Sequence, residues 1–512
     1  MLRKIFSLIA LPLAVFVTPA RAEWREASSD HFLIYADAGE EWTRKFADRL
    51  ERFDAMMRLR SNLKTAPEQR SNRLVVYILD SPEAVAKICG NCRNVAGFYS
   101  PRVGGSVVYT ARTRGDGPLS LDAETILFHE YSHHLMLENF AVAYPSWFIE
   151  GYAEYNSTFE VERDGSMLVG APARHRAYSL ILGDKLPITE LLDRAARMTG
   201  EQIGVFYGRA WVLTHLLLTD PARAGQLAKY LKAFAEGKKS IDAATEAFGD
   251  LRALDRDISR AIGKPFAYKR FPAAAIKPVT VAMRTLTPGE AATMPVRLRS
   301  DRGVDRKAAL ALLPEAQKRA APFPADPGAQ EVLAEAEFDA GNWVAAEAAA
   351  DRALAADPKR LQALIYKGRS VMRRTVEAKA TDDAAWGEVR RWFIRANKVD
   401  PNAAEPLMRF YQIFVARDQK PTANAALGLY RAFELSPQAA ELRVLAARQL
   451  LFDDKPADAR QTLLPLAYDP HGSPGSKLAG LIVAAIDAGI PARTIARLGA
   501  KAGQANDALE LD

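Results

Sequence analysis

The spacing of hydrophobic and polar residues changes along the chain, and the change separates a region of mixed strands and helices from a region of helices alone. Residues 40–60 carry apolar side chains at three-to-four spacing, which predicts a helix with one buried face. Ser81 and Pro82 supply an N-cap and a first-turn proline for a shorter helix. From about residue 120 to residue 263 the pattern is mostly helical. Because stretches of strand character surround the first two helices, we expect an α+β domain; these stretches are 31–35, 73–79, 96–100 and 106–110.

Proline and alanine mark the rest of the chain. Residues 264–302 are rich in proline and contain alternating stretches at 279–283 and 294–298, which predict a small β element or linker. Beyond residue 303 alanine is frequent and a short phrase that ends in proline recurs. The spacing of these prolines is close to the period of a helix–turn–helix repeat; they are Pro358, Pro401, Pro437 and Pro470. We therefore expect an all-α domain of about four units over residues 303–512.

The clearest copy of this repeat spans residues 327–358. Gly341 would make the turn between two helices, small residues would let the helices approach, and Asp357-Pro358 would end the second helix. This pattern resembles the tetratricopeptide repeat family. The resemblance implies stacked antiparallel helix pairs whose concave surface binds a protein partner. A generic alanine-rich helical bundle is the alternative.

The N-terminus has the pattern of a secretory signal. A basic pair at residues 3–4 precedes an apolar run over residues 5–17, and the segment ends in Ala-Arg-Ala at Ala22. We expect cleavage after Ala22, which removes residues 1–22 and makes the protein periplasmic or secreted. A retained membrane anchor is the alternative, but the run is shorter than the roughly 20 residues that cross a bilayer. No later uncharged apolar stretch has that length, so we expect no membrane span after signal removal.

Composition excludes several classes of protein. The 512 residues are 49% hydrophobic and 26% charged, which is typical of a soluble globular chain. The net charge is +7, but Arg3, Lys4 and Arg21 of the expected signal contribute three of these charges. The remainder contains no long run of Lys or Arg, so the surplus does not make a phosphate-binding face. We expect no nucleic-acid partner.

The only two cysteines, Cys89 and Cys92, are three positions apart. In an oxidising compartment this spacing favours a local disulfide. A redox-active dithiol is the alternative, but the flanking sequence lacks the strand-then-helix setting that lowers a thiol pKa. A structural zinc site would need four ligands, and no second pair of Cys or His residues lies nearby.

The candidate chemistry lies in a His-Glu-x-x-His segment at residues 129–133. Residues four apart share one face of a helix, so His129 and His133 can present two imidazoles to a single ion. Glu130 can reach a water bound to that ion and act as a general base. Two neutral nitrogen ligands and an open position suit one Zn²⁺ ion.

A third ligand is available in the next predicted helix. Glu150 follows His133 by 17 positions, which leaves room for the first helix to end near residues 139–140 and for the chain to turn and return. Two His and one Glu leave the fourth zinc position for water, as a hydrolase needs. Glu154 lies one turn after Glu150, and its carboxylate could accept the free N–H of a zinc-bound imidazole and set its tautomer.

The pairing of His129-Glu130-Tyr-Ser-His133 with Trp-Phe-Ile-Glu150-Gly-Tyr-Ala resembles the gluzincin metallopeptidases, the peptidase MA-like branch related to aminopeptidase N and thermolysin. The resemblance implies an α+β peptidase domain over residues 23–263. It implies that His129, His133 and Glu150 bind zinc and that Glu130 is the general base. It also implies that Glu154 corresponds to the family's second acid, one helical turn after the glutamate ligand. It does not cover the repeats.

Related gluzincins use a Tyr or a His of a later helix to stabilise the oxyanion, which makes Tyr207 the first choice here and His215 the second. Either residue could equally be part of the core. His134 is expected to be a bystander or to support a ligand. The resemblance also implies that the strand at residues 106–110 pairs with an extended substrate.

These observations predict an exported zinc peptidase, followed by tetratricopeptide-like repeats, that hydrolyses a peptide or protein substrate. The alternative is an envelope scaffold whose repeats bind a protein partner and whose front domain holds metal without catalysis.

Overall fold

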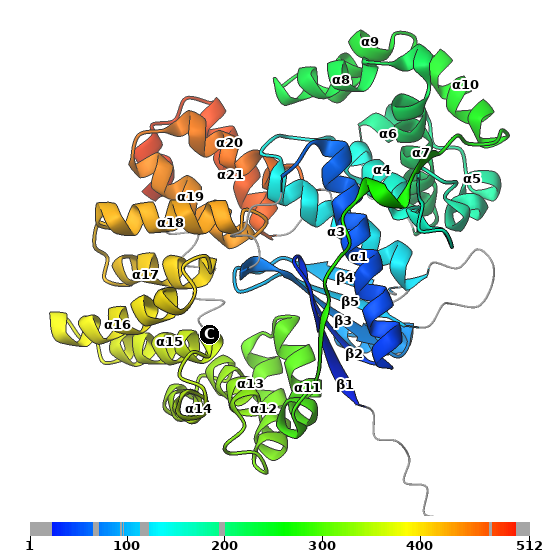
Figure 1. The fold of residues 1–512 in the computed structure, drawn as a ribbon. Helices are drawn as coiled ribbons and strands as arrows, with labels where there is room; N and C mark the ends of the chain where they lie inside the picture. The colour runs from blue at the N-terminus through cyan, green and yellow to red at the C-terminus, as the bar shows by residue number, and fades with distance from the viewer. Residues whose placement is uncertain are drawn as a thin grey trace, which may run out of the picture.

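The protein has an α+β region followed by an all-helical region, as the hydrophobic pattern predicts (Figure 1). The computed structural model describes residues 23–64, 71–92, 95, 97–112, 122–193, 200–469 and 474–497. The signal predicted at residues 1–22 lies outside these residues. Among the helices that are described, none is long and apolar enough to span a membrane.

A six-stranded sheet forms the frame of the first region. Its strand order is β4-β5-β3-β2-β1-β9, with parallel pairing only between β2 and β3 and between β3 and β5. The strands are β1 (Trp24–Ser28), β2 (Phe32–Asp37), β3 (Leu74–Leu79), β4 (Gly97–Ser100), β5 (Val107–Ala111) and β9 (Ala282–Thr285). All four predicted strand segments before residue 120 are therefore confirmed.

Both faces of this sheet are covered, because its strands place apolar side chains on alternate sides. One face packs against α1 (Glu40–Ser61) and α3 (Ala123–Asn139), where Phe53 and Phe128 stack with ring centroids 4.2 Å apart. The other face packs against α2 (Pro82–Cys89) and against α11 (Pro288–Asp301), which is the first helix of the all-helical region.

The rest of the first region continues from α3 through α4 (Ser146–Ser157), which packs against α3. A three-stranded sheet has the order β6-β7-β8. The other elements of this region are β6 (Glu160–Val161), β7 (Met167–Val169), the 3-10 turn η2 (Arg174–Arg176), α5 (Ala177–Leu182), α6 (Ile188–Leu192), α7 (Gly200–Thr219), the 3-10 turn η3 (Pro221–Arg223), α8 (Gln226–Ala235), α9 (Ser240–Phe248), α10 (Leu251–Ile262), β8 (Lys269–Phe271) and the 3-10 turn η4 (Ala273–Ala275).

The segment 264–302 is only partly the β linker that its pattern predicts. It contains β8 and β9, but residues 294–298 are helical because they belong to α11. Their alternation has a different cause: Met294 and Leu298 pack on the sheet, whereas Val296 packs on the opposite side into the core of the following helices. A helix buried on two sides shows apolar residues at two-residue spacing, which imitates a strand.

The all-helical region consists of consecutive helices that curve around one end and one face of the sheet (Figure 1). After α11 come α12 (Arg306–Ala320), α13 (Pro327–Asp339), α14 (Trp343–Ala356), α15 (Leu361–Glu377), α16 (Asp383–Val399), α17 (Ala404–Ala416), α18 (Ala423–Leu435), α19 (Ala440–Phe452), α20 (Pro456–Ala467) and α21 (Pro474–Asp487). As predicted, α14, α16, α18 and α20 each end a few residues before a recurring proline.

The inner side of this helical curve faces the α+β region. The first helices of the successive pairs, α13, α15, α17 and α19, line a cavity of about 530 Å³ together with the β4–β5 loop. Val103 of that loop packs beside Met408 and Tyr411 in one apolar cluster. Gly104 passes so close to α17 that a Cβ there would lie 2.6 Å from Glu405 Oε2. The loop therefore packs against the inner side of the helical curve.

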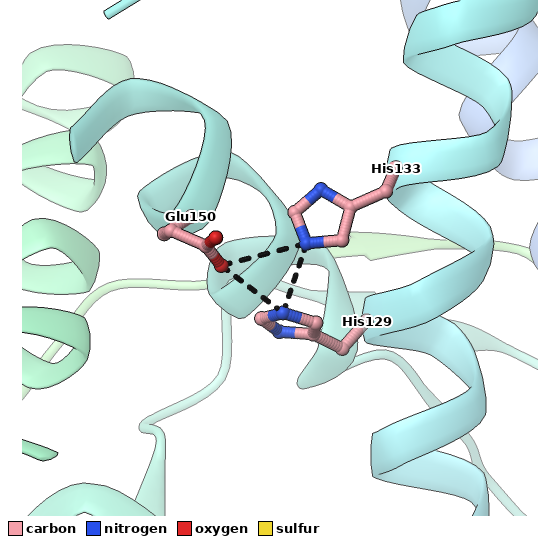
Figure 2. Close-up of side chains that lie close together, drawn as sticks. All are labelled: His129, His133 and Glu150. Atoms are coloured by element: carbon pink, nitrogen blue, oxygen red, sulfur yellow. Dashed lines mark hydrogen bonds and ion pairs between the residues drawn. The ribbon is translucent and has the colours of Figure 1, made fainter. Parts of the chain in front are cut away.

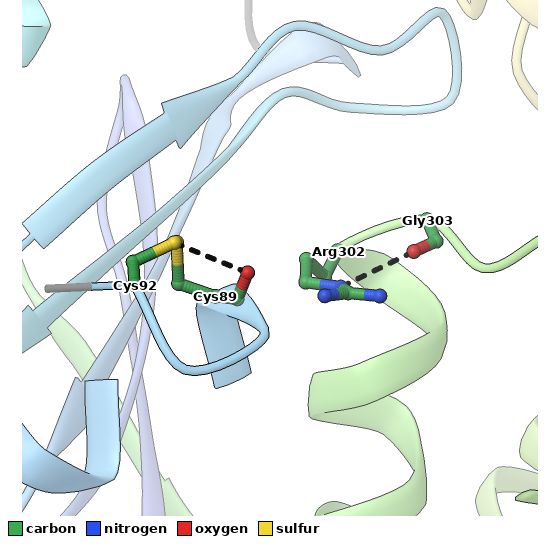
Figure 3. Close-up of a disulfide and its surroundings, with 4 residues drawn as sticks. All are labelled: Cys89, Cys92, Arg302 and Gly303. Carbon is green, nitrogen blue, oxygen red and sulfur yellow. Dashed lines mark hydrogen bonds between the residues drawn. A yellow bond between two sulfur atoms is a disulfide. The ribbon is translucent and has the colours of Figure 1, made fainter. Parts of the chain in front are cut away.

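The predicted disulfide between Cys89 and Cys92 is present at the end of α2 (Figure 3). Gly90, the C-cap of α2, has a φ of 93°, a conformation that favours glycine and lets the chain turn back within the bridge. Figure 3 places Arg302, which follows α11, beside this turn. The disulfide is thus remote from the His-Glu-x-x-His segment and joins a turn at the sheet face that α11 covers.

Candidate metal centre

Helix α3 carries the His-Glu-x-x-His segment. Its N-cap is Asp122, whose side chain accepts a hydrogen bond of 2.7 Å from the Thr125 backbone N–H. The helix ends at Asn139, where the sequence predicts its end, and Pro145 precedes α4. These two ends bring the middle of α3 and the first turns of α4 together, because the loop between them is short.

Three side chains from these helices converge on one point (Figure 2). The Nε2 atoms of His129 and His133 are 3.1 Å apart. Glu150 Oε2 lies 3.3 Å from the first nitrogen and 3.4 Å from the second. The structure therefore brings together the three residues predicted as metal ligands.

The dimensions of this triangle fit a zinc ion. Four ligand atoms about 2.0–2.1 Å from a tetrahedral centre lie about 3.3 Å from one another. The observed separations of 3.1, 3.3 and 3.4 Å are therefore those of one face of such a tetrahedron, and the fourth vertex is left for water or substrate. Two imidazoles and one carboxylate are also a donor set that zinc accepts.

Glu154 holds the far side of the His129 ring. Its Oε1 atom lies 3.1 Å from His129 Nδ1, so that nitrogen donates to the carboxylate and Nε2 is the ring atom that faces the triangle. This is the role that its position one turn after Glu150 predicts.

Glu154 has two further partners that the sequence did not indicate. His175 Nε2 lies 2.9 Å from Glu154 Oε2, and the Arg176 guanidinium donates to both carboxylate oxygens at 3.0 and 2.5 Å. Both residues stand in the turn η2, inside a run Arg-His-Arg at 174–176. That run is a weak signal, because nothing in its local pattern places His175 and Arg176 against a carboxylate 21 and 22 residues earlier in the chain.

The charges of the centre shift its pKa values in opposite directions. Burial lowers the pKa of His129, but hydrogen bonds with Glu150 and Glu154 more than offset it and raise the pKa to about 10. Burial raises the pKa of Glu150, but the two imidazoles hold it far below its ordinary value. The pKa of Glu154 is also held well below its ordinary value, against burial, chiefly by Arg176. Both carboxylates are therefore anionic at neutral pH, which suits a site for a divalent cation.

Close packing between α4 and α7 fixes the position of Glu150. The next residue, Gly151, faces α7, where a Cβ would lie 2.5 Å from the backbone oxygen of Ala210. Because a backbone atom cannot move aside as a side chain can, only glycine fits at this contact. Glu150 itself is fully buried, so its carboxylate has a defined place.

The other candidate catalytic residues lie at the edge of this triangle. Glu130 is partly exposed and lines a cavity together with His133. Tyr207, on α7, has its ring centroid 6.0 Å from that of His129, and the Arg176 guanidinium lies over the same tyrosine ring at 5.0 Å. Both residues are thus placed beside the proposed ligands.

Two other histidines that the sequence analysis considered, His215 and His134, have structural roles. His215 is 2% exposed among aromatic rings, and its Nε2 donates to the Ala267 carbonyl oxygen at 2.7 Å. This hydrogen bond occupies the nitrogen that an oxyanion donor would use, so the second choice for that role was wrong. His134 is buried, and its Nδ1 lies 2.9 Å from the Tyr99 hydroxyl, which makes it a bystander to the triangle.

A second group of possible ligands, His31, Glu51 and Asp54, lies on the other side of α3. His31 binds Glu51 twice, through its backbone N–H and through Nδ1, each at 2.8 Å. Asp54 accepts from the Tyr131 hydroxyl at 2.6 Å and from Arg58 Nε at 2.7 Å. These donors already satisfy the carboxylates, so the group is an internal ion-pair network rather than an open site.

The expected pairing of substrate with the strand at 106–110 is wrong. That strand, β5, is hydrogen-bonded to β3 on one side and to β4 on the other, which leaves it no free edge. The strands at the two ends of the sheet are β4 and β9. An extended peptide could add only to such an edge.

Replacement of Glu154 by Gln is expected to weaken zinc binding by about 10- to 100-fold, because the His129 imidazole loses the anion that orients it. Competition titration with a chromogenic chelator would measure the affinity. The matched control is Glu160→Gln, since Glu160 is exposed on β6. Equal zinc affinity in Glu154→Gln and the wild-type protein would show that Glu154 does not support the ligand.

Comparison with known proteins finds no matching family model and no curated protein of significant similarity.

Proposed function

We propose that this protein is a zinc-dependent peptidase of the gluzincin type. The observation that carries the proposal is the triangle of His129, His133 and Glu150, whose edges are those of a tetrahedral zinc site, with Glu130 next to the first ligand on the same helix. The fourth zinc position that three protein ligands leave, together with an adjacent carboxylate, is what hydrolysis by an activated water requires.

The roles of the residues follow from their places. A zinc ion bound there would acidify a water molecule and polarise the carbonyl of the scissile bond. Glu130 takes the proton from the attacking water and passes it to the leaving amine. Glu154 keeps His129 in the tautomer that ligates, and Arg176 keeps Glu154 ionised.

Tyr207 is the proposed donor to the oxyanion. Its place beside His129 and its aromatic contact with Arg176 support this role, because a phenol near a cation is a good hydrogen-bond donor. Of the two candidates from the sequence, Tyr207 has its ring beside that of a proposed ligand, whereas His215 lies among aromatic rings of the core.

We further propose that the helical region is a tetratricopeptide-like array. Paired helices that end before regularly spaced prolines support it. The alternative function, an envelope scaffold with a free peptide groove, is less well supported, because the β4–β5 loop lies in the groove that a partner would need. Export after Ala22 and action on a peptide or protein substrate complete the proposal.

The test combines metal analysis with a peptide library. We expect the purified protein to bind one zinc ion per chain and to cleave peptides, with activity lost in a strong chelator and restored by zinc. Zinc binding with no cleavage of any library member would instead favour the scaffold. Cleavage that survives complete removal of the metal would contradict the proposed mechanism.

A further inference from the structure

A cavity of about 360 Å³ opens directly beside the proposed catalytic residues. Glu130 and His133 form one part of its wall. A peptide whose scissile carbonyl reached the triangle would therefore place a neighbouring side chain in this cavity. Its volume lies within the range of small-molecule pockets and is enough for an aromatic side chain.

Apolar side chains form most of the wall on the α+β side. They come from the last turns of α3, the loop that follows it and α4, and include Met136, Phe140, Tyr144 and Ile149. Such a wall offers few hydrogen-bond partners to a polar substrate side chain, whose burial would then be costly. It favours an apolar one.

The opposite wall belongs to the helical region. Ala440 at the start of α19 and Leu466 near the end of α20 line the cavity, about 300 residues further along the chain than Glu130. Figure 1 shows these last helices lying next to the α3 end of the α+β region. The α+β region alone would therefore leave this side of the cavity open to water.

Hydrogen bonds hold the two walls together. Arg443 is 2% exposed, and its guanidinium donates to the Leu137 carbonyl oxygen of α3 at 3.1 Å and to the Thr462 carbonyl oxygen of α20 at 2.8 Å. Gln461 donates to the Ala141 carbonyl oxygen. These contacts join α19 and α20 to the end of the helix that carries His129 and His133, so the position of the helical wall is defined relative to the metal centre.

We propose that this cavity is a specificity pocket that the helical region completes, and that it selects a bulky apolar side chain, of the leucine, methionine or phenylalanine kind, next to the scissile bond. The proposal rests on the peptidase activity proposed above. It gives the helical region a direct part in substrate choice, in place of a separate partner-binding role.

The test measures how the zinc-loaded wild-type protein and two zinc-loaded variants cleave peptides that are randomised on both sides of the scissile bond. The wild-type protein is expected to prefer a bulky apolar residue over glycine at one flanking position by at least about tenfold in kcat/KM. Ala440→Phe, which fills the cavity from the helical wall, is expected to lower that ratio by at least about tenfold. The matched control Ala457→Phe makes the same change at an exposed position of α20 and should keep the wild-type ratio.

Leu466→Ala provides a second variant that widens the same pocket, and it should shift the preference towards larger side chains. Two results would overturn the pocket and leave the peptidase proposal standing. The first is cleavage by the wild-type protein without an apolar preference. The second is an equal loss of kcat/KM on bulky and on glycine peptides in Ala440→Phe. Failure of the zinc-loaded wild-type protein to cleave any peptide would overturn both.

Discussion

Replacement of Glu130 by Gln is expected to lower kcat for peptide hydrolysis by at least about 100-fold while the protein keeps its zinc. The amide has nearly the size of the carboxylate but cannot take a proton from water. Glu130 is next to a proposed ligand yet outside the triangle itself, so the loss of its charge leaves all three ligand atoms in place. Steady-state kinetics and metal analysis of the same preparation measure the two quantities.

The control for this change is Glu124→Gln, the same substitution on the first turn of α3, at a residue paired with Arg49. It should retain activity. Peptide turnover that is the same in Glu130→Gln and in the wild-type protein would remove Glu130 as the base. Loss of zinc together with activity would show that Glu130 acts as a ligand.

Replacement of Glu150 by Gln is expected to weaken zinc binding by more than about 100-fold, a larger effect than for a residue that only supports a ligand. The reason is that Glu150 supplies the one anionic atom of the triangle and is fully buried. Zinc added at about 100 times the wild-type Kd should stabilise the wild-type protein by about 2.7 kcal/mol, and this gain should nearly vanish in the variant. Thermal unfolding with and without zinc measures it.

The chelator-stripped wild-type protein is the reference for this experiment, because it separates loss of the metal from a fold damaged by the substitution. Circular dichroism of Glu150→Gln should match it. One zinc ion per chain bound to the variant with wild-type affinity would take Glu150 out of the ligand set and leave the two histidines without a third protein ligand.

Local periodicity was enough to predict the elements that carry the chemistry. The i, i+4 spacing of His129 and His133 places both rings on one face of any α-helix, whatever surrounds it. Asp122 caps the start of α3 through a residue only three positions away. The recurring prolines end helices because proline cannot continue them. In each case the signal lies within a few residues.

Other features were missed because their cause lies far away in the chain. The alternation of apolar residues at 294–298 is compatible with a helix only because that helix is buried on two sides. Met294 packs in the core on the sheet, and Val296 packs in the core of the following helices. The inner position of β5 depends on which strands pair with it. The role of His215 in the core depends on the Ala267 carbonyl oxygen, 52 residues later.

The sequence by itself determined most helices, the order of the two regions, and the place of two candidate ligands and a candidate base on one helical turn, because these follow from local geometry. The spacing of Glu150 made it a candidate third ligand, but only the tertiary structure brought its carboxylate to the two imidazoles, since this needs α4 packed against α3 and against α7 at Gly151. The tertiary structure alone placed the Arg176 guanidinium against the Glu154 carboxylate and brought α19 and α20 to the cavity beside the triangle. Contacts between distant residues leave no local pattern, because the packing energy that selects them exists only once the chain has folded.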